Sequence, residues 1–207
     1  MTIKLEACVG SYKEGKRAEE LGANRIELCD NLGQGGTTPS YGTILQCKKD
    51  LNIDINVIIR PRGGDFVYSS EELEIMKSDI ELCKKSGVNG VVFGFLKEDN
   101  TLDFEITKEF VEFSKPLSVT FHMAFDEIED KLGTIDLLAS LDIDRILTKG
   151  GDISAFNNVE KLRELIEYAG DRIIILPGGG VTSENYLELK EKTLAKEFHG
   201  SKIVGVL

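Results

Sequence analysis

Three pairs of chemically reactive side chains lie two residues apart within short stretches that resemble strands. The pairs are Glu6 with Cys8, Glu27 with Cys29, and Glu197 with His199. Because side chains alternate between the two faces of a strand, both members of each pair share one face. Carboxylates and imidazoles can carry protons, and thiolates are ligands that Cu(I) prefers. The spacing therefore predicts proton transfer, metal binding or both on that face.

Two arginines follow directly after the third expected strand. Arg60 and Arg62 flank a proline, which stiffens the segment and holds both guanidinium groups near the carboxyl end of the strand. Carboxylates on an inner face are costly unless they are paired, and the arginines available to Glu6 and Glu27 are Arg25, Arg60 and Arg62. These charges form either a buried ion network or a reactive site.

Both histidines of the chain come at the ends of expected strands. His122 ends the fifth and His199 ends the eighth, so each is placed to carry a proton or to bind a metal ion. Asp126 comes four residues after His122, and we expect it to orient the imidazole. The four cysteines fall into two groups. Cys8 and Cys29 lie at the ends of expected strands, whereas Cys47 and Cys83 lie on expected helices, where we expect them to serve in packing.

Glycine-rich turns follow the last three expected strands. Such turns expose backbone N–H groups, helix N-termini attract anions, and barrels often bind phosphate with the loops after strands seven and eight. We expect an anion-binding corner there, formed by Lys149, Gly150, Gly178, Gly179, Gly180 and Gly200.

A repeated strand-then-helix pattern must position all of these residues. The expected strands are 5–9, 25–28, 55–59, 90–93, 118–121, 145–147, 173–176 and 195–198. Alternating strands and helices predict a parallel sheet, in which reactive groups gather past the carboxyl ends of the strands. Eight strands favour a TIM-like (β/α)8 barrel over an open doubly wound sheet. Only residues 203–207 remain beyond the last turn, so we expect the final helix to be short or missing.

Helix signals support this pattern. Helices are expected over 11–21, from Thr38-Pro39 to about 49, and from a capping box at Ser69 and Glu72 to about 85. Four more are expected near 104–113, 128–141, 158–169 and 183–192.

Length and composition narrow the class of protein. The 207 residues contain no Pro/Ser-rich linker, which predicts a single domain over 1–207. The formal net charge of −11 disfavours a nucleic-acid or anionic-membrane binder. The sequence has no apolar run near the roughly 20 residues that span a bilayer, and its first residues lack a signal-peptide layout. With no C-x-x-C pair, we expect reduced thiols and a cytoplasmic protein.

Several segments together resemble the copper homeostasis protein CutC family over nearly the whole chain. They are Arg25-Ile-Glu-Leu-Cys29, Gly35-Gly-Thr-Thr-Pro-Ser40, Arg60-Pro-Arg-Gly-Gly-Asp-Phe-Val-Tyr68, Val92-Phe-Gly94, Thr120-Phe-His122, Pro177-Gly-Gly-Gly180 and Glu197-Phe-His199. The resemblance implies a cytoplasmic, homo-oligomeric TIM-like barrel linked to copper handling, and no established reaction. Carried over by position, it implies a pocket of Glu6, Glu27, Arg60, Arg62, His122, Asp126 and His199, with Cys8 and Cys29 as thiol ligands.

Two positions depart from the family pattern. Met123 replaces a basic residue usual after His122, and Lys149 replaces a serine usual after the sixth strand. The first hypothesis is a protein that binds Cu(I) through Cys8 and Cys29. The alternative is an enzyme that acts on a small anionic or phosphorylated compound with the charged residues of the barrel mouth. A non-catalytic assembly protein is a third possibility, and it leaves the mouth-facing charges without a role.

Overall fold

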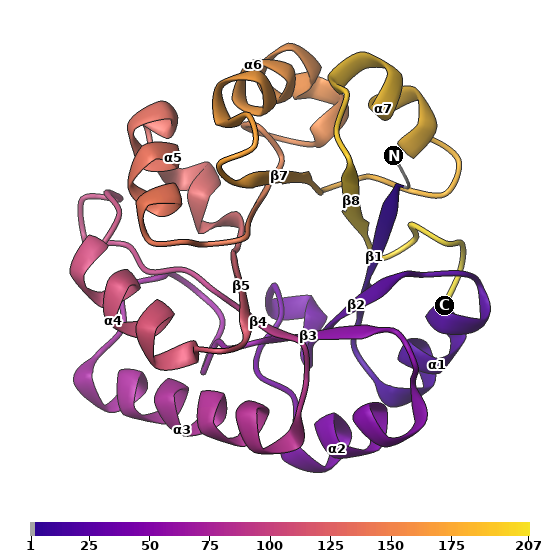
Figure 1. Ribbon diagram of the computed structural model, residues 1–207, viewed down its shortest axis with the longest axis vertical. Coiled ribbons are helices and arrows are strands. Elements are labelled where there is room, and N and C mark those ends of the chain that lie inside the picture. The colour runs from indigo at the N-terminus through magenta and orange to yellow at the C-terminus, as the bar shows by residue number, and fades with distance from the viewer. Residues whose placement is uncertain (1–2) are drawn as a thin grey trace.

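Eight parallel strands form one ring in the computed structural model, which describes residues 3–207 (Figure 1). Seven ladders join them in the order β7-β6-β5-β4-β3-β2-β1-β8. Strands β7 and β8 lie side by side where the ring closes, without a ladder between them. The bounds are β1 Lys4–Val9, β2 Arg25–Leu28, β3 Asp54–Ile58, β4 Gly90–Phe93, β5 Ser118–Phe121, β6 Arg145–Thr148, β7 Ile174–Pro177 and β8 Glu197–Gly200. The predicted TIM-like barrel is confirmed.

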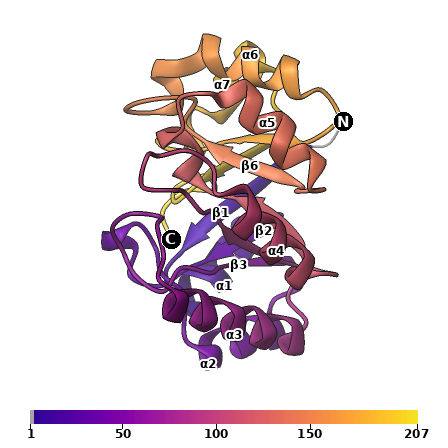
Figure 2. The same ribbon diagram turned by 90° about the vertical axis from the view of Figure 1, so that its left-hand side faces the viewer.

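Helices cover the outside of this ring, as the two perpendicular views show (Figures 1 and 2). They are α1 Tyr12–Glu20, α2 Tyr41–Asp50, α3 Ser70–Ser86, α4 Phe104–Ser114, α5 Lys131–Ser140, α6 Val159–Ala169 and α7 Tyr186–Thr193. Residues 201–207 after β8 form turns and one isolated bridge between Lys202 and Thr182, and contain no helix. Within residues 3–207, no helix combines the length and apolar character needed to cross a bilayer.

Local signals explain where several helices begin. Ser69 caps α3 and shares a capping box with Glu72, as the sequence predicts. The Ser11 side chain accepts a hydrogen bond from the Glu14 N–H and caps α1. The helix expected from Thr38-Pro39 instead begins at Tyr41, because the Ser40 side chain accepts a hydrogen bond from the Thr43 N–H. Thr38 pairs with Arg60 across the loops, which holds it outside the helix.

The two faces of the ring have opposite chemistry. Ile26 and Leu28 point outward from β2 and are fully buried among the apolar residues under the helices. Their neighbours Arg25 and Glu27 face the lumen, and Glu6 does the same on β1. Because alternation is set by strand geometry, the polar side chains collect inside the barrel while apolar side chains fill the layer outside it.

Candidate functional site at the carboxyl end of the barrel

A buried ion network fills the lower lumen. The Arg25 Nε donates to a Glu6 carboxylate oxygen, and its Nη2 donates to Glu197 Oε2 at 2.6 Å. Arg145 also donates to Glu197 Oε2, at 2.8 Å. Arg25 and Glu6 are almost fully buried, so each charge depends on its partner to offset the loss of hydration. Arg25 therefore supplies the pairing for Glu6 that the sequence left open between three arginines.

His199 extends this network toward the barrel mouth. Its Nδ1 lies 2.8 Å from Glu6 Oε1, and its Nε2 lies 3.7 Å from Glu27 Oε2. The pairing of β1 with β8 sets Glu6 beside His199, although 193 residues separate them. Burial alone would lower the pKa of His199, but Cys8, Glu27 and Glu6 outweigh that effect and raise the pKa well above its usual range. An imidazolium therefore sits between two carboxyl groups.

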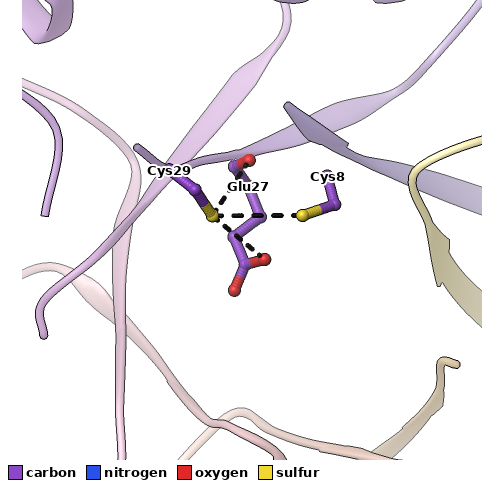
Figure 3. A group of neighbouring side chains, drawn as sticks. All are labelled: Cys8, Glu27 and Cys29. Atoms are coloured by element: carbon purple, nitrogen blue, oxygen red, sulfur yellow. Dashed lines mark hydrogen bonds between the residues drawn. The ribbon is translucent and has the colours of Figure 1, made fainter. Parts of the chain in front are cut away.

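Cys8, Glu27 and Cys29 form a compact cluster (Figure 3), in which Glu27 contacts His199. The two Sγ atoms are 4.0 Å apart, and Cys29 Sγ lies 3.5 Å from Glu27 Oε2. One ligand atom from each residue lies within 4.8 Å of the other two. The spacing of these three side chains would allow them to bind one metal ion together, and among the described residues they are the group of His, Cys, Asp and Glu side chains for which this holds.

The electrostatics of this cluster separate the two thiols. The hydrogen bond from Cys29 lowers the pKa of Cys8 well below its ordinary value, and His199 acts in the same direction. The same hydrogen bond, together with burial, raises the pKa of Cys29 well above its ordinary value. Burial and the nearby Cys8 raise the pKa of Glu27 to about 8. The cluster thus holds one thiolate close to a thiol and to a carboxyl group that is mostly protonated at neutral pH.

A cavity of about 530 Å³ opens over this cluster at the carboxyl ends of the strands. It brings together five predicted site residues, namely Cys8, Glu27, Arg60, His122 and His199. Its remaining lining is Leu32, Gln34, Gly35, Ile58, Gly64, Phe66, Met123, Leu147 and Ser201. The cavity therefore has a polar floor near the thiols and a largely apolar wall.

Two glycines at inward positions keep this space open. A Cβ at Gly94 would lie 2.6 Å from the His122 ring, and one at Gly178 would lie 2.6 Å from Leu147 and 3.0 Å from Met123. Contacts that short cannot be accommodated without moving the neighbour. The absence of side chains after β4 and β7 therefore lets His122 and Met123 reach the cavity.

His122 and Arg60 present unpartnered donors at the cavity. His122 Nδ1 accepts a hydrogen bond from the Ala124 N–H at 3.2 Å, which places the proton of the neutral ring on Nε2. Burial and the nearby Arg60 lower the pKa of His122 to about 3. Neither His122 Nε2 nor Arg60 Nε has a hydrogen-bond partner among residues 3–207, although both atoms are buried. Buried polar groups seldom lack partners, so both atoms indicate a place for a ligand.

Three residues predicted for this pocket do not line it, and neither does Cys29. Glu6 lies in the ion network, where it pairs with Arg25 and His199. Arg62 turns away toward α3, where it pairs with Glu72 at 2.6 Å and with Asp65 at 3.0 Å. Asp126 does not orient His122, because its carboxylate accepts hydrogen bonds from the Thr148 hydroxyl and from the Lys149 N–H instead. Asp126 lies in a short 3-10 helix, Met123–Glu127, after β5, and its side chain reaches the end of β6.

The glycine-rich corner differs from the expected anion site. The N–H groups of Gly150 and Gly178 already donate to Thr148, and the Lys149 N–H is taken by the Asp126 carboxylate. Helix α7 begins at Tyr186, three residues later than the expected start near residue 183. None of the six predicted corner residues, Lys149, Gly150, Gly178, Gly179, Gly180 and Gly200, lines the cavity among the described residues.

Phe66, to which no role was assigned from the sequence, packs against the side chains of both His122 and Arg60. Its ring centroid is 4.7 Å from that of His122 and 4.9 Å from the guanidinium carbon of Arg60. The signal available was its place in the Arg-Pro-Arg-Gly-Gly-Asp-Phe segment, where an apolar residue follows a run of polar and turn-forming ones. Only the folded loop shows that the ring forms part of the cavity wall.

Comparisons with known proteins agree on one family. The profile of the CutC family matches residues 3–204. The human protein named copper homeostasis protein cutC homolog is 45% identical over 197 residues, which cover 95% of this chain and 72% of that protein. A CutC family protein from Enterococcus faecalis is 46% identical over 206 residues, covering 96% and 99% of the two chains. The crystal structure of CutC from Streptococcus agalactiae superimposes with a TM-score of 0.94 at 39% identity, covering 98% of this chain and 100% of that one.

Proposed function

Because the chain belongs to the CutC family, we propose that it acts in copper homeostasis by binding Cu(I) through the thiolates of Cys8 and Cys29. Relatives carry copper homeostasis in their names, and this chain has a thiol pair at the mouth of its barrel. Cu(I) is a soft ion that favours sulfur over nitrogen and oxygen ligands. Cu(I) and free thiols both require a reducing compartment, which supports a cytoplasmic site of action.

The observation that carries this proposal is the separation of the two sulfur atoms. Metal–thiolate bonds are about 2.3 Å long in zinc sites, so two sulfurs 4.0 Å apart can contact one ion without backbone movement. Cys8 is already poised as the thiolate, because its hydrogen bond with Cys29 and the nearby His199 lower its pKa. The carboxyl group of Glu27 lies beside both sulfur atoms and would supply a third ligand after losing its proton.

Competition titrations with a chromophoric Cu(I) chelator test this proposal. We expect Cys8→Ser and Cys29→Ser to weaken Cu(I) binding by about a hundredfold or more, since each removes one of two soft ligands. Cys47→Ser and Cys83→Ser are matched controls, because these cysteines are fully buried on α2 and α3, outside the cavity lining. Native affinity in Cys8→Ser and Cys29→Ser would refute the assignment of these two ligands.

A further inference from the structure

We propose that the same cavity binds a small apolar monocarboxylic acid, whose carboxylate is held by the Nε–H of Arg60 and the Nε2–H of His122. Both side chains line the cavity, and both donors are buried without a partner. The acid would lie across the wall formed by Phe66, Ile58 and Leu147, above the thiol cluster. This site is separate from the proposed Cu(I) ligands, and it does not depend on copper binding.

Arg60 supplies the charge that an acid needs. Its side chain is 4% exposed, and its other nitrogens donate only to backbone carbonyl groups, those of Gln34, Gly36 and Gly64. No carboxylate of the described residues lies within salt-bridge distance of it, in contrast to Arg25, which has two. A buried cation without a counter-ion is costly, and a bound anion would remove that cost.

His122 supplies a second donor whose direction is fixed. The Ala124 N–H occupies Nδ1, so the ring cannot turn Nε2 away without losing that bond. The ring also packs closely against the backbone of Gly94, since a Cβ at that position would lie 2.6 Å from ring atoms of His122. The lowered pKa of His122 keeps the ring neutral at physiological pH, which leaves Nε2 as a donor of one hydrogen bond. Phe66 packs against both side chains.

The charge balance favours a carboxylate over a phosphate. One guanidinium without a counter-ion matches one negative charge, and two donors match the two oxygens of a carboxylate. A phosphate dianion would bring a second charge against Leu32, Ile58 and Leu147, and the other cation of the lining, His199, is already paired with Glu6. Three backbone N–H groups of the glycine-rich corner, those of Lys149, Gly150 and Gly178, already donate to Asp126 and Thr148 and are not free to hold a phosphate. The same apolar wall suits a hydrocarbon body on the acid.

Calorimetric titration of the metal-free full chain with isovalerate tests the proposal. Isovaleramide has nearly the same shape without the charge, and inorganic phosphate tests the alternative anion. We expect isovalerate to bind at least about tenfold more tightly than either, the size of effect that one charge-assisted hydrogen bond gives. Because no metal is present, the result is independent of the Cu(I) titrations.

Two variants assign the binding to the named donors. Arg60→Lys keeps the charge and removes Nε–H, and His122→Asn keeps an acceptor for the Ala124 N–H while removing Nε2–H. Each should weaken isovalerate binding about tenfold or more. Arg62→Lys is the matched control, because Arg62 pairs with Glu72 and does not line the cavity. Isovalerate should also shift the Nε2–H signal of His122 in NMR spectra of the native protein.

Four outcomes would overturn the proposal. The first three are no binding of isovalerate at millimolar concentration, equal binding of isovalerate and isovaleramide, and binding that survives both Arg60→Lys and His122→Asn. The fourth is tighter binding of phosphate than of isovalerate, which would favour an anion site at the glycine-rich corner instead. Circular dichroism of each variant establishes that a loss of binding is not a loss of fold. If Arg60→Lys does not fold, the His122→Asn titration and the NMR shift still decide the question.

Discussion

Replacement of Arg25 by methionine tests the ion network that supports the site. Arg25 bridges Glu6 and Glu197, and all three side chains are at least nine-tenths buried. Removing one partner of a buried ion pair costs about 3–5 kcal/mol, because the remaining charge is left without compensation. Arg145 still pairs with Glu197 at 2.8 Å, and His199 still pairs with Glu6 at 2.8 Å. We therefore expect Arg25→Met to lower the free energy of unfolding by about 3 kcal/mol, near the lower end of that range.

Urea unfolding at two pH values separates this electrostatic effect from a packing defect. Arg25 and His199 oppose the effect of burial and hold the pKa of Glu6 at about 2, below its ordinary value of 4.5. A carboxylate with a lowered pKa in the folded state adds stability that is complete above 4.5 and is lost as the pH falls toward 2. The difference between native protein and Arg25→Met should therefore shrink by at least about 1 kcal/mol between pH 7 and pH 4.

Arg172→Met is the matched control for this experiment. Arg172 pairs with Asp136, but both side chains are about half exposed, so the pair should contribute no more than about 1 kcal/mol. If Arg25→Met destabilises the protein no more than this control, the buried network does not support the barrel as argued. A difference that stays constant between pH 7 and pH 4 would show that lost packing, not lost charge pairing, is the cause.

Three further predictions concern the cavity itself. Gly94→Ala should lower the free energy of unfolding in urea by about 1–3 kcal/mol and abolish isovalerate binding, because the new Cβ would collide with the His122 ring. Gly33→Ala is the control: a Cβ there would have no heavy atom within 4 Å, so the free energy of unfolding should change by less than about 0.5 kcal/mol. Iodoacetamide at pH 6 should modify Cys8 first, as read by peptide mass spectrometry, since its pKa is lowered and it lines the cavity; faster labelling of any other cysteine would contradict this. The free energy of unfolding of Glu27→Gln, measured with urea, should rise relative to that of the native protein between pH 5 and pH 8. The native protein loses stability over this range because the folded state holds the pKa of Glu27 at about 8 and resists its ionisation, whereas glutamine does not titrate. Parallel pH profiles of the two proteins would refute the raised pKa.

The fold could be predicted because each of its signals is local. Seven of the eight strands were placed within one residue at both ends, and the eighth lay two residues later than expected. Alternation along β2 gave the outward direction of Ile26 and the inward direction of Glu27, since every second side chain shares a face. Polar residues at strand ends then indicated which end of the barrel to inspect.

The partners of these residues could not be predicted in the same way. Three arginines were available to Glu6, and only the register of β1 against β2 and β8 brings Arg25 and His199 to it. Arg62 lies two residues from Arg60, yet its side chain leaves the cavity for Glu72, because the loop between β3 and α3 turns there. A loop conformation depends on contacts across the whole molecule, so its sequence alone does not direct its side chains.

Local patterns in the chain are enough to place the eight strands, their order along the chain and the side chains that face inward, because strand periodicity and turn-forming residues act over a few positions. The contacts between these side chains follow only from the closure of the ring. That closure brought Cys8 within 4.0 Å of Cys29, set His199 against Glu6, and left Nε of Arg60 and Nε2 of His122 buried without partners. Those outcomes depend on distances between segments that are far apart in the chain, and distances of that kind exist only once all eight strands have packed.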